Sequence, residues 1–97
     1  MIIVLGSVIV KDCCIDESLK ISQQHVNRSR NEPGCIAHAV HLDSENSQCL
    51  VFVEKWSDQA SLNQHFKEPT SIEFVKKLKE IVTNTPEMSI YDATQLK

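Results

Sequence analysis

Residues 2–10 read Ile-Ile-Val-Leu-Gly-Ser-Val-Ile-Val, and the rest of the predicted fold is arranged around this run. Most of its residues are β-branched, and both of its alternating faces are apolar. A strand of this kind is covered on both sides, so we expect it in the centre of a sheet. Residues 49–56, Cys-Leu-Val-Phe-Val-Glu-Lys-Trp, form a second run that predicts a central strand.

A helix is expected after the first strand, from Asp16 to about Asn31. Asp16 can cap it by accepting a hydrogen bond from a free backbone N–H of the first turn. At the other end, Pro33 moves the preceding residue away from helical angles, and Gly34 permits the chain to reverse. The apolar face of this helix is thin, because Ser22 interrupts it.

A β-hairpin follows this helix. Residues 35–42 alternate loosely and predict a strand, and the polar residues 43–47 predict a turn. The partner is the strand 49–56, across a loop of about five residues. Such a hairpin sets His38 opposite residue 53 or 54, a choice of register that the sequence leaves open.

The second helical region is divided by Pro69. Ser57 or Asp58 caps the helix before the proline, and Thr70 with Glu73 forms a capping box for the helix after it. The later helix has a core-facing stripe at helical spacing. The stripe consists of Phe74, Val75, Leu78, Ile81 and Val82.

After Pro86, residues 87–95 predict a last strand, so the elements follow the order β-α-β-β-α-β. This order is typical of the ferredoxin-like α+β fold, in which a four-stranded antiparallel sheet carries its helices on one face. The topology places strands 2–10 and 49–56 in the middle of the sheet, as their apolar faces require. We expect a single domain over residues 1–97.

The face of the sheet without helices also has to be buried. Ile2, Val4, Val8 and Val10 point to one side of the first strand and Ile3, Leu5 and Ile9 to the other, so both faces of the sheet carry apolar side chains there. The simplest cover is the sheet of a second copy packed face to face, so we expect a homodimer. A monomer with an exposed apolar sheet face is the alternative.

Composition and charge exclude several classes of protein. Ten Lys and Arg residues stand against thirteen Asp and Glu, a net charge of -3, which argues against a nucleic-acid binder. An RNA-binding ferredoxin-like domain would also need exposed aromatic pairs on its central strands. The longest apolar run, residues 2–5, is too short for a membrane span of about 20 residues, and no secretory signal is visible. We therefore expect a soluble, cytoplasmic protein that binds neither nucleic acid nor membrane.

The four cysteines do not predict a disulfide framework. Cys13 and Cys14 are adjacent, which is poor geometry for a mutual bridge. Cys35 and Cys49 open the two strands of the hairpin and so lie at its opposite ends. No CxxC motif or Cys/His metal spacing occurs. We expect four reduced thiols.

His65 is the first candidate for chemistry. It follows Leu62 by three residues and so shares the inward half of a short helix. An imidazole with an unperturbed pKa of about 6.5 suits proton transfer near neutral pH. The alternative is a core or rim histidine hydrogen-bonded to the backbone.

Glu54 stands between Phe52 and Trp56 on one face of its strand. A carboxylate on a buried face needs a partner, or its pKa rises. It can bind a substrate hydroxyl or position the histidine; alternatively, it pairs with Arg28 or Arg30. Trp56 offers a flat apolar wall with an N–H donor, or belongs to the core.

The remaining histidines carry weaker signals. His38 shares the face of Glu54 in one hairpin register and lies on the surface in the other, and the surface position is the simpler interpretation. His25 and His41 carry no comparable argument. Two glycines and four scattered histidines supply neither a phosphate-cradling loop nor a set of metal ligands. We expect an enzyme built from these residues to work without a bound nucleotide or metal.

Taken together, these motifs resemble the antibiotic biosynthesis monooxygenase (ABM) family of small dimeric α+β barrels. Similar proteins include oxygenases that oxidise polycyclic phenols or quinols without metal or cofactor, haem-degrading enzymes, and a relative that acts on a quorum-signal sugar phosphate. The resemblance covers nearly the whole chain. It is carried by Arg30-x-Glu32-Pro33-Gly34-Cys35, by Phe52-Val53-Glu54-Lys55-Trp56-Ser57-Asp58, by Ala60-x-Leu62-x-x-His65-Phe66, and by Pro69.

The resemblance implies a cofactor-independent monooxygenase that oxidises a small aromatic quinol or polyphenol with O₂. The deprotonated ring would give an electron directly to O₂, in a dry pocket that stabilises the anion. His65 would be the base or anion partner, and Glu54 would orient a hydroxyl or hold His65. The substrate-binding residues would be Trp56, Phe52, His38 and Phe66.

The chain departs from the family pattern in places. Thr70 and Ser71 follow the proline where a histidine and an aromatic are common, and His38 replaces a frequent tyrosine. The haem-degrading branch fits poorly, because Val75 stands where that branch has its proximal histidine and His65 replaces its pocket tryptophan. Two other functions stay open. One is an acid–base isomerase that uses the same pocket without O₂, and the other is a non-catalytic small-molecule binding or stress-response module.

Overall fold

The computed structural model describes all of residues 1–97. The predicted order of strands and helices is confirmed, with the second helical region split at Pro69. No helix combines the length and the apolar character that crossing a membrane requires. The elements are β1 (Ile2–Ile9), a short 3₁₀ turn η1 (Asp12–Cys14), α1 (Ile15–Ser29), β2 (Cys35–Asp43), β3 (Asn46–Trp56), α2 (Gln59–Lys67), α3 (Pro69–Lys79) and β4 (Glu87–Asp92).

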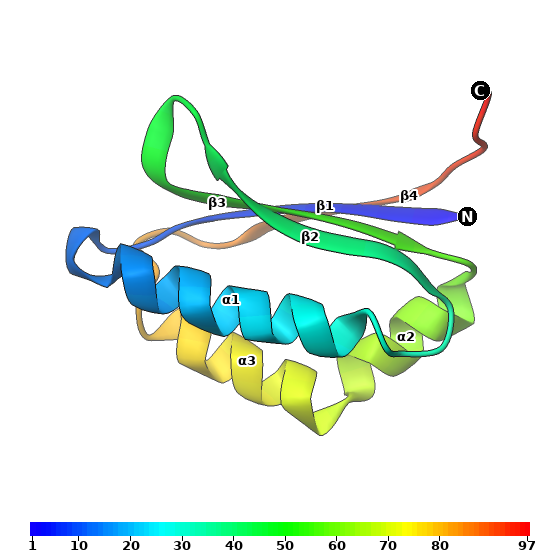
Figure 1. Cartoon of the computed structure of the whole chain (residues 1–97), viewed down its shortest axis with the longest axis horizontal. Coiled ribbons are helices and arrows are strands. Elements are labelled where there is room, and N and C mark those ends of the chain that lie inside the picture. Colours follow the sequence, from blue (N-terminus) through cyan, green and yellow to red (C-terminus); the bar gives the residue numbers. More distant parts are fainter.

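The four strands form one antiparallel sheet in the order β2-β3-β1-β4. The two strands with apolar residues on both faces, β1 and β3, are the central ones, as predicted. All three α-helices lie on one face of this sheet, and both ends of the chain lie at the same end of it (Figure 1). The α+β, ferredoxin-like fold with a four-stranded antiparallel sheet is therefore confirmed.

The core between the sheet and the helices is divided in two. The larger cluster surrounds Phe52, Phe74 and Leu78, and the smaller one surrounds Trp56 and Leu62. Because side chains alternate along β3, residue 54 faces the helices between these two clusters. A buried polar residue thus lies between the two apolar clusters of the core.

The opposite face of the sheet has no helix over it. Leu5 is 44% exposed and Tyr91 is 50% exposed. Strand register puts Val53 beside Leu5, and Tyr91 beside Ile3, on the same face. This arrangement agrees with the prediction that β1 is apolar on both sides.

Helix starts differ from the sequence-based prediction in two places. Helix α1 begins at Ile15 with Cys14 as its N-cap, because η1 leads directly into it, so the predicted cap Asp16 lies in the first turn. Helix α3 begins at Pro69, whose fixed φ suits the first helical position. The predicted capping box at Thr70 is therefore wrong. The cap at Asp58 is confirmed, since its Oδ1 accepts from the Ser61 N–H at 2.8 Å.

The hairpin turn is tighter than predicted. Only Ser44 and Glu45 separate β2 from β3, in place of a loop of about five residues. The side chains beside the turn make this possible, because Asp43 Oδ1 accepts from the Glu45 N–H at 2.8 Å and Asn46 Oδ1 accepts from the Gln48 N–H at 3.0 Å. Strand β3 consequently begins at residue 46 rather than 49.

The stripe predicted for the last helix is only partly in the core. Phe74 and Leu78 are buried, whereas Val75 is exposed. Ile81 and Val82 lie beyond the end of α3 and are partly buried against the larger cluster. All four cysteines are free thiols, as predicted.

Candidate active site

Glu54 is the polar centre of the buried face. The alternation of β3 brings it between Phe52 and Trp56, as predicted, and it is only 5% exposed. Its Oε1 accepts a hydrogen bond from Trp56 Nε1 at 3.0 Å. The predicted alternative, a pair with Arg28 or Arg30, is not formed. Arg30 instead donates from Nε to the backbone oxygen of His38 at 3.0 Å.

His38 lies directly opposite Glu54 in the β2–β3 ladder. A register shift between Cys35 and Ala37, with Ile36 as the extra residue, brings it there, since an unbroken ladder from Cys35 would turn His38 to the other face. His38 is 2% exposed, so the surface interpretation is wrong. Its Nε2 is 3.3 Å from Glu54 Oε1, but neither ring nitrogen meets a hydrogen-bond partner in good alignment.

His65 projects from α2 into the same buried region. Its ring rests against Trp56, with 4.7 Å between ring centroids, and its Nε2 lies 3.8 Å from Glu54 Oε1. Its Nδ1 is 2.7 Å from Oε1 of Glu32. An ionised carboxylate only accepts hydrogen bonds, so a Glu32 carboxylate takes this bond from an N–H at Nδ1, and the neutral form of that tautomer has its lone pair on Nε2.

Glu32 has no role in the sequence-based prediction, although it belongs to the Glu-Pro-Gly motif. The loop that carries it docks against the start of α2. Gly34 has a φ of +82°, and a Cβ at this position would collide with the side chains of Ser57 and Ser61. The Ser57 N–H donates to the Gly34 carbonyl at 2.8 Å. The motif therefore places Glu32 beside His65.

His25 is the second residue that sequence reasoning missed. It lies on the buried side of α1, one turn after Ile21, a spacing that could have revealed it. Its ring stacks on Phe74 with a centroid separation of 4.1 Å and an interplanar angle of 6°. Burial, together with the neighbouring imidazoles of His38 and His65, lowers the pKa of His25 to about 3.

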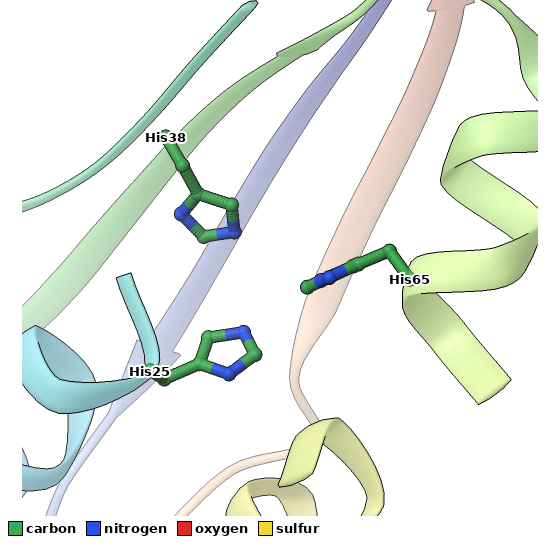
Figure 2. A group of neighbouring side chains, drawn as sticks. All are labelled: His25, His38 and His65. Atoms are coloured by element: carbon green, nitrogen blue, oxygen red, sulfur yellow. The ribbon is translucent and has the colours of Figure 1, made fainter. Parts of the chain in front are cut away.

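Three histidines converge from three different elements. Figure 2 shows the rings of His25, His38 and His65 directed toward one another from α1, β2 and α2. One ring nitrogen from each lies within 4.8 Å of the others. The expectation that the histidines are too scattered to form a set of metal ligands is therefore wrong for three of the four. His41 lies apart, exposed on the surface.

Glu54 is held as a carboxylate by its neighbours. Burial raises the pKa of its carboxyl group, but the nitrogens of His38, Trp56 and His65 offset this and bring the pKa below its usual value. The Glu54 carboxylate therefore lies among nitrogen atoms that favour its charged form. A neutral group in its place would lose the electrostatic attraction to these nitrogens.

A cavity of about 610 Å³ opens between α3 and the sheet. His25, Glu54 and His65 contribute buried polar groups to its lining, which also includes Ser7, Ser71, Lys76, Lys79 and Glu87. The predicted substrate-binding residues divide here: Phe52 and Phe66 line the cavity, whereas His38 and Trp56 do not and are completely enclosed by protein. The apolar wall is made mainly by Phe66, Ile72, Phe74, Val75, Leu78 and Met88.

Two small residues shape the cavity. Gly6 faces the helices opposite Phe52, and the absence of a side chain there leaves β1 open to the space. Ser71 of α3 also lines it, and its buried hydroxyl has no hydrogen-bond partner. The site thus offers an imidazole flanked by two carboxylates at the edge of an apolar space that fits a small ring system.

The comparisons with known proteins agree with this fold. The family model for antibiotic biosynthesis monooxygenase matches residues 1–77. The uncharacterized protein sll1783 of Synechocystis sp. is 34% identical over 90 residues, which are 93% of this chain and 61% of that protein. The chain thus spans about three fifths of the length of this curated relative.

Solved structures give the same result. A crystal structure of an antibiotic biosynthesis monooxygenase superposes with a TM-score of 0.91 at 25% identity, over 98% of this chain and 100% of that chain. A conserved protein from Methanosarcina mazei Go1 has a TM-score of 0.91 at 28% identity, over 96% and 92%. A protein from Deinococcus radiodurans shares the fold, with a TM-score of 0.94 at 19% identity over 100% and 96%. The chain therefore belongs to the antibiotic biosynthesis monooxygenase family and has its ferredoxin-like, α+β-barrel type of fold.

Proposed function

We propose that the protein is a monooxygenase that oxidises a small aromatic quinol or polyphenol with O₂, and that the reaction uses no metal or organic cofactor. The observation that carries this proposal is the contact between Glu32 and His65. It leaves the lone pair of His65 on Nε2, beside Glu54 and an apolar cavity.

The cavity supports binding of a flat, mostly apolar ring. Phe52, Phe66 and the apolar side chains of α3 would contact the ring faces and edge, and exclude water from it. The buried polar partners for the hydroxyl groups of the ring would then be His25, Glu54, His65 and Ser71. The polar groups would thus decide the orientation of the ring.

His65 would act as the general base. Its Nε2 would take a proton from a ring hydroxyl, and the imidazolium that forms would be flanked by the carboxylates of Glu32 and Glu54. A phenolate gives up an electron far more readily than the neutral phenol. The protein would therefore prepare the substrate for reaction with O₂ by removing one proton in a dry environment.

The electron balance supports a reaction without an external reductant. A quinol loses two electrons when it becomes a quinone and two more when one ring C–H becomes C–OH. These four electrons reduce O₂, so one oxygen atom enters the ring and the other leaves as water. The expected product of a quinol is accordingly a hydroxyquinone.

A second copy of the chain is part of the proposal. The exposed apolar face around Leu5 and Tyr91 lies on the far side of the sheet from the cavity. A second sheet packed against it would bury this face and leave the cavity as it is. We therefore propose that the working form is a homodimer.

The test is O₂ uptake by chelator-treated protein with a panel of hydroquinones and anthrone-like phenols. We expect uptake above autoxidation, with one atom from ¹⁸O₂ in the product. His65→Gln should lower kcat by about 10² to 10⁴-fold, and His41→Gln, an exposed histidine outside the site, should not. Equal uptake by His65→Gln would remove the base from the mechanism. No uptake with any ring, but His65-dependent isomer formation, would replace the proposal with an acid–base isomerase.

A further inference from the structure

We propose that His25, His38 and His65, together with Glu54, bind one divalent first-row transition-metal ion such as Zn²⁺ or Co²⁺. The three imidazoles come from α1, β2 and α2 and point into one space (Figure 2). One nitrogen of each lies within 4.8 Å of the others. The proposal goes beyond the proposed oxygenase reaction and does not rest on it, although the metal site would share His65 and Glu54 with that reaction.

His38 is the strongest indication of a ligand. The residue is 2% exposed and both ring nitrogens are buried: Nδ1 has no hydrogen-bond partner, and Nε2 has only Glu54 Oε1 at 3.3 Å, in poor alignment for a hydrogen bond. Buried polar atoms are nearly always satisfied, because an unpaired one loses its hydration without compensation. A metal ion at the centre of the cluster would accept the lone pair of one of these two nitrogens and so satisfy that nitrogen.

His65 is oriented as metal-bound histidines usually are. A histidine ligand commonly donates its second N–H to a carboxylate, which fixes the tautomer and the ring orientation. Glu32 makes this contact with Nδ1 at 2.7 Å. The nitrogen left free is Nε2, the one that faces Glu54.

Glu54 completes the donor set with negative charge. Its Oε1 is 3.3 Å from His38 Nε2 and 3.8 Å from His65 Nε2. Three imidazoles with one carboxylate suit Zn²⁺, Co²⁺, Fe²⁺ and Ni²⁺ rather than Ca²⁺ or Mg²⁺, which prefer oxygen ligands alone. The ion can enter through the cavity, because His25, Glu54 and His65 line it.

The geometry requires a modest contraction. Ligand nitrogens at about 2.1 Å from a tetrahedral ion lie about 3.4 Å apart, so the rings have to close by up to about 1.4 Å. Rotations of three side chains on three separate elements can supply this movement. Because the ion would occupy Nε2 of His65, metal binding and proton abstraction by that nitrogen exclude each other.

The test uses the full chain with Cys13→Ser and Cys14→Ser, so that the exposed pair of thiols cannot bind metal. Chelator-treated protein is titrated with Zn²⁺ by calorimetry and with Co²⁺ by absorption. We expect one ion per chain and a Co²⁺ spectrum without thiolate charge-transfer bands. His25→Gln and His38→Gln should each weaken binding by at least about 100-fold, since loss of a mere supporting contact costs 10- to 100-fold. His41→Gln should bind like the parent.

A second measurement needs no variant of the cluster. In imidazole NMR spectra of the same protein, Zn²⁺ should shift the signals of three histidines and leave that of His41 in place. Absence of stoichiometric binding would overturn the proposal. So would shifts confined to His41, or equal affinity in the His25, His38 and His41 variants that retain native circular dichroism.

Discussion

Oε1 of Glu32 lies 2.7 Å from Nδ1 of His65, and this contact joins the loop after α1 to helix α2 across 33 residues of sequence. The loop can approach so closely because Gly34 has no side chain to meet the start of α2. One short motif therefore serves two purposes: it ends the first helix, and it fixes which nitrogen of His65 is free.

Glu32→Gln should lower kcat with little change in KM. The amide keeps a hydrogen-bond acceptor but loses the charge that stabilises a protonated His65. We therefore expect kcat to fall roughly tenfold, which is only part of the full contribution of a general base. Steady-state O₂ uptake measures it. Glu45→Gln, in the distant hairpin turn, is the control. A change in KM alone would mean that Glu32 contacts the substrate rather than the base.

Trp56→Phe should lower the free energy of unfolding by about 1–3 kcal/mol, because Glu54 keeps its buried charge and loses the donor at 3.0 Å. Urea unfolding followed by circular dichroism measures the loss. Combining it with Glu54→Gln in a double-mutant cycle should give a coupling of about 0.5–3 kcal/mol. Strict additivity of the two changes in unfolding free energy would show that the hydrogen bond from the indole N–H does not stabilise the carboxylate.

The arrangement of the sheet was predictable because it depends on patterns within single strands. Both faces of β1 and β3 are apolar, and this topology puts these two strands in the middle of the sheet. Helix starts at Ile15 and Pro69 were not predictable in the same way. Helix α1 starts where the turn η1 ends, before the capping side chain of Asp16. Helix α3 starts at Pro69, whose ring favours the first helical position, before the capping side chain of Thr70.

The site was predictable only where one element determines it. The face shared by Phe52, Glu54 and Trp56 follows from the period of two in a strand. The position of His38 depends on a single extra residue in β2, which no local pattern reveals. His25 escaped notice because serines surround it on the buried side of α1, leaving a weak apolar stripe around it.

Gly34→Ala should destabilise the protein by more than about 1 kcal/mol. Its φ of +82° is unfavourable for a residue with a Cβ, and the added atom would collide with Ser57 and Ser61. Gly6→Ala is the matched control, because its Cβ would meet Glu87 O at 3.5 Å and Phe52 Cβ at 3.8 Å, both ordinary contacts. Equal thermal stability of the two variants would contradict the tight docking of the Gly34 loop.

Leu5→Glu should convert the proposed homodimer to a monomer. The change puts a charge in the middle of the open sheet face, where Leu5 is 44% exposed in the single chain. Light scattering coupled to size exclusion gives the mass directly. Leu96→Glu, an equal change on a side chain that is 95% exposed near the C-terminus, should leave the mass unaltered. A monomeric parent protein would remove the dimer from the proposal.

Ser71 and Ser22 provide a matched pair for testing the cavity. Each has a buried hydroxyl without a hydrogen-bond partner, but only Ser71 lines the cavity. Replacing either by Ala removes an unsatisfied polar group, so neither variant should lose more than about 0.5 kcal/mol of stability. If the Ser71 hydroxyl binds a substrate hydroxyl, Ser71→Ala should raise KM by about fivefold or more. This factor corresponds to the binding free energy of one neutral hydrogen bond. Ser22→Ala should leave KM unchanged. The same KM in both variants would place the substrate hydroxyls at His65 and Glu54 alone.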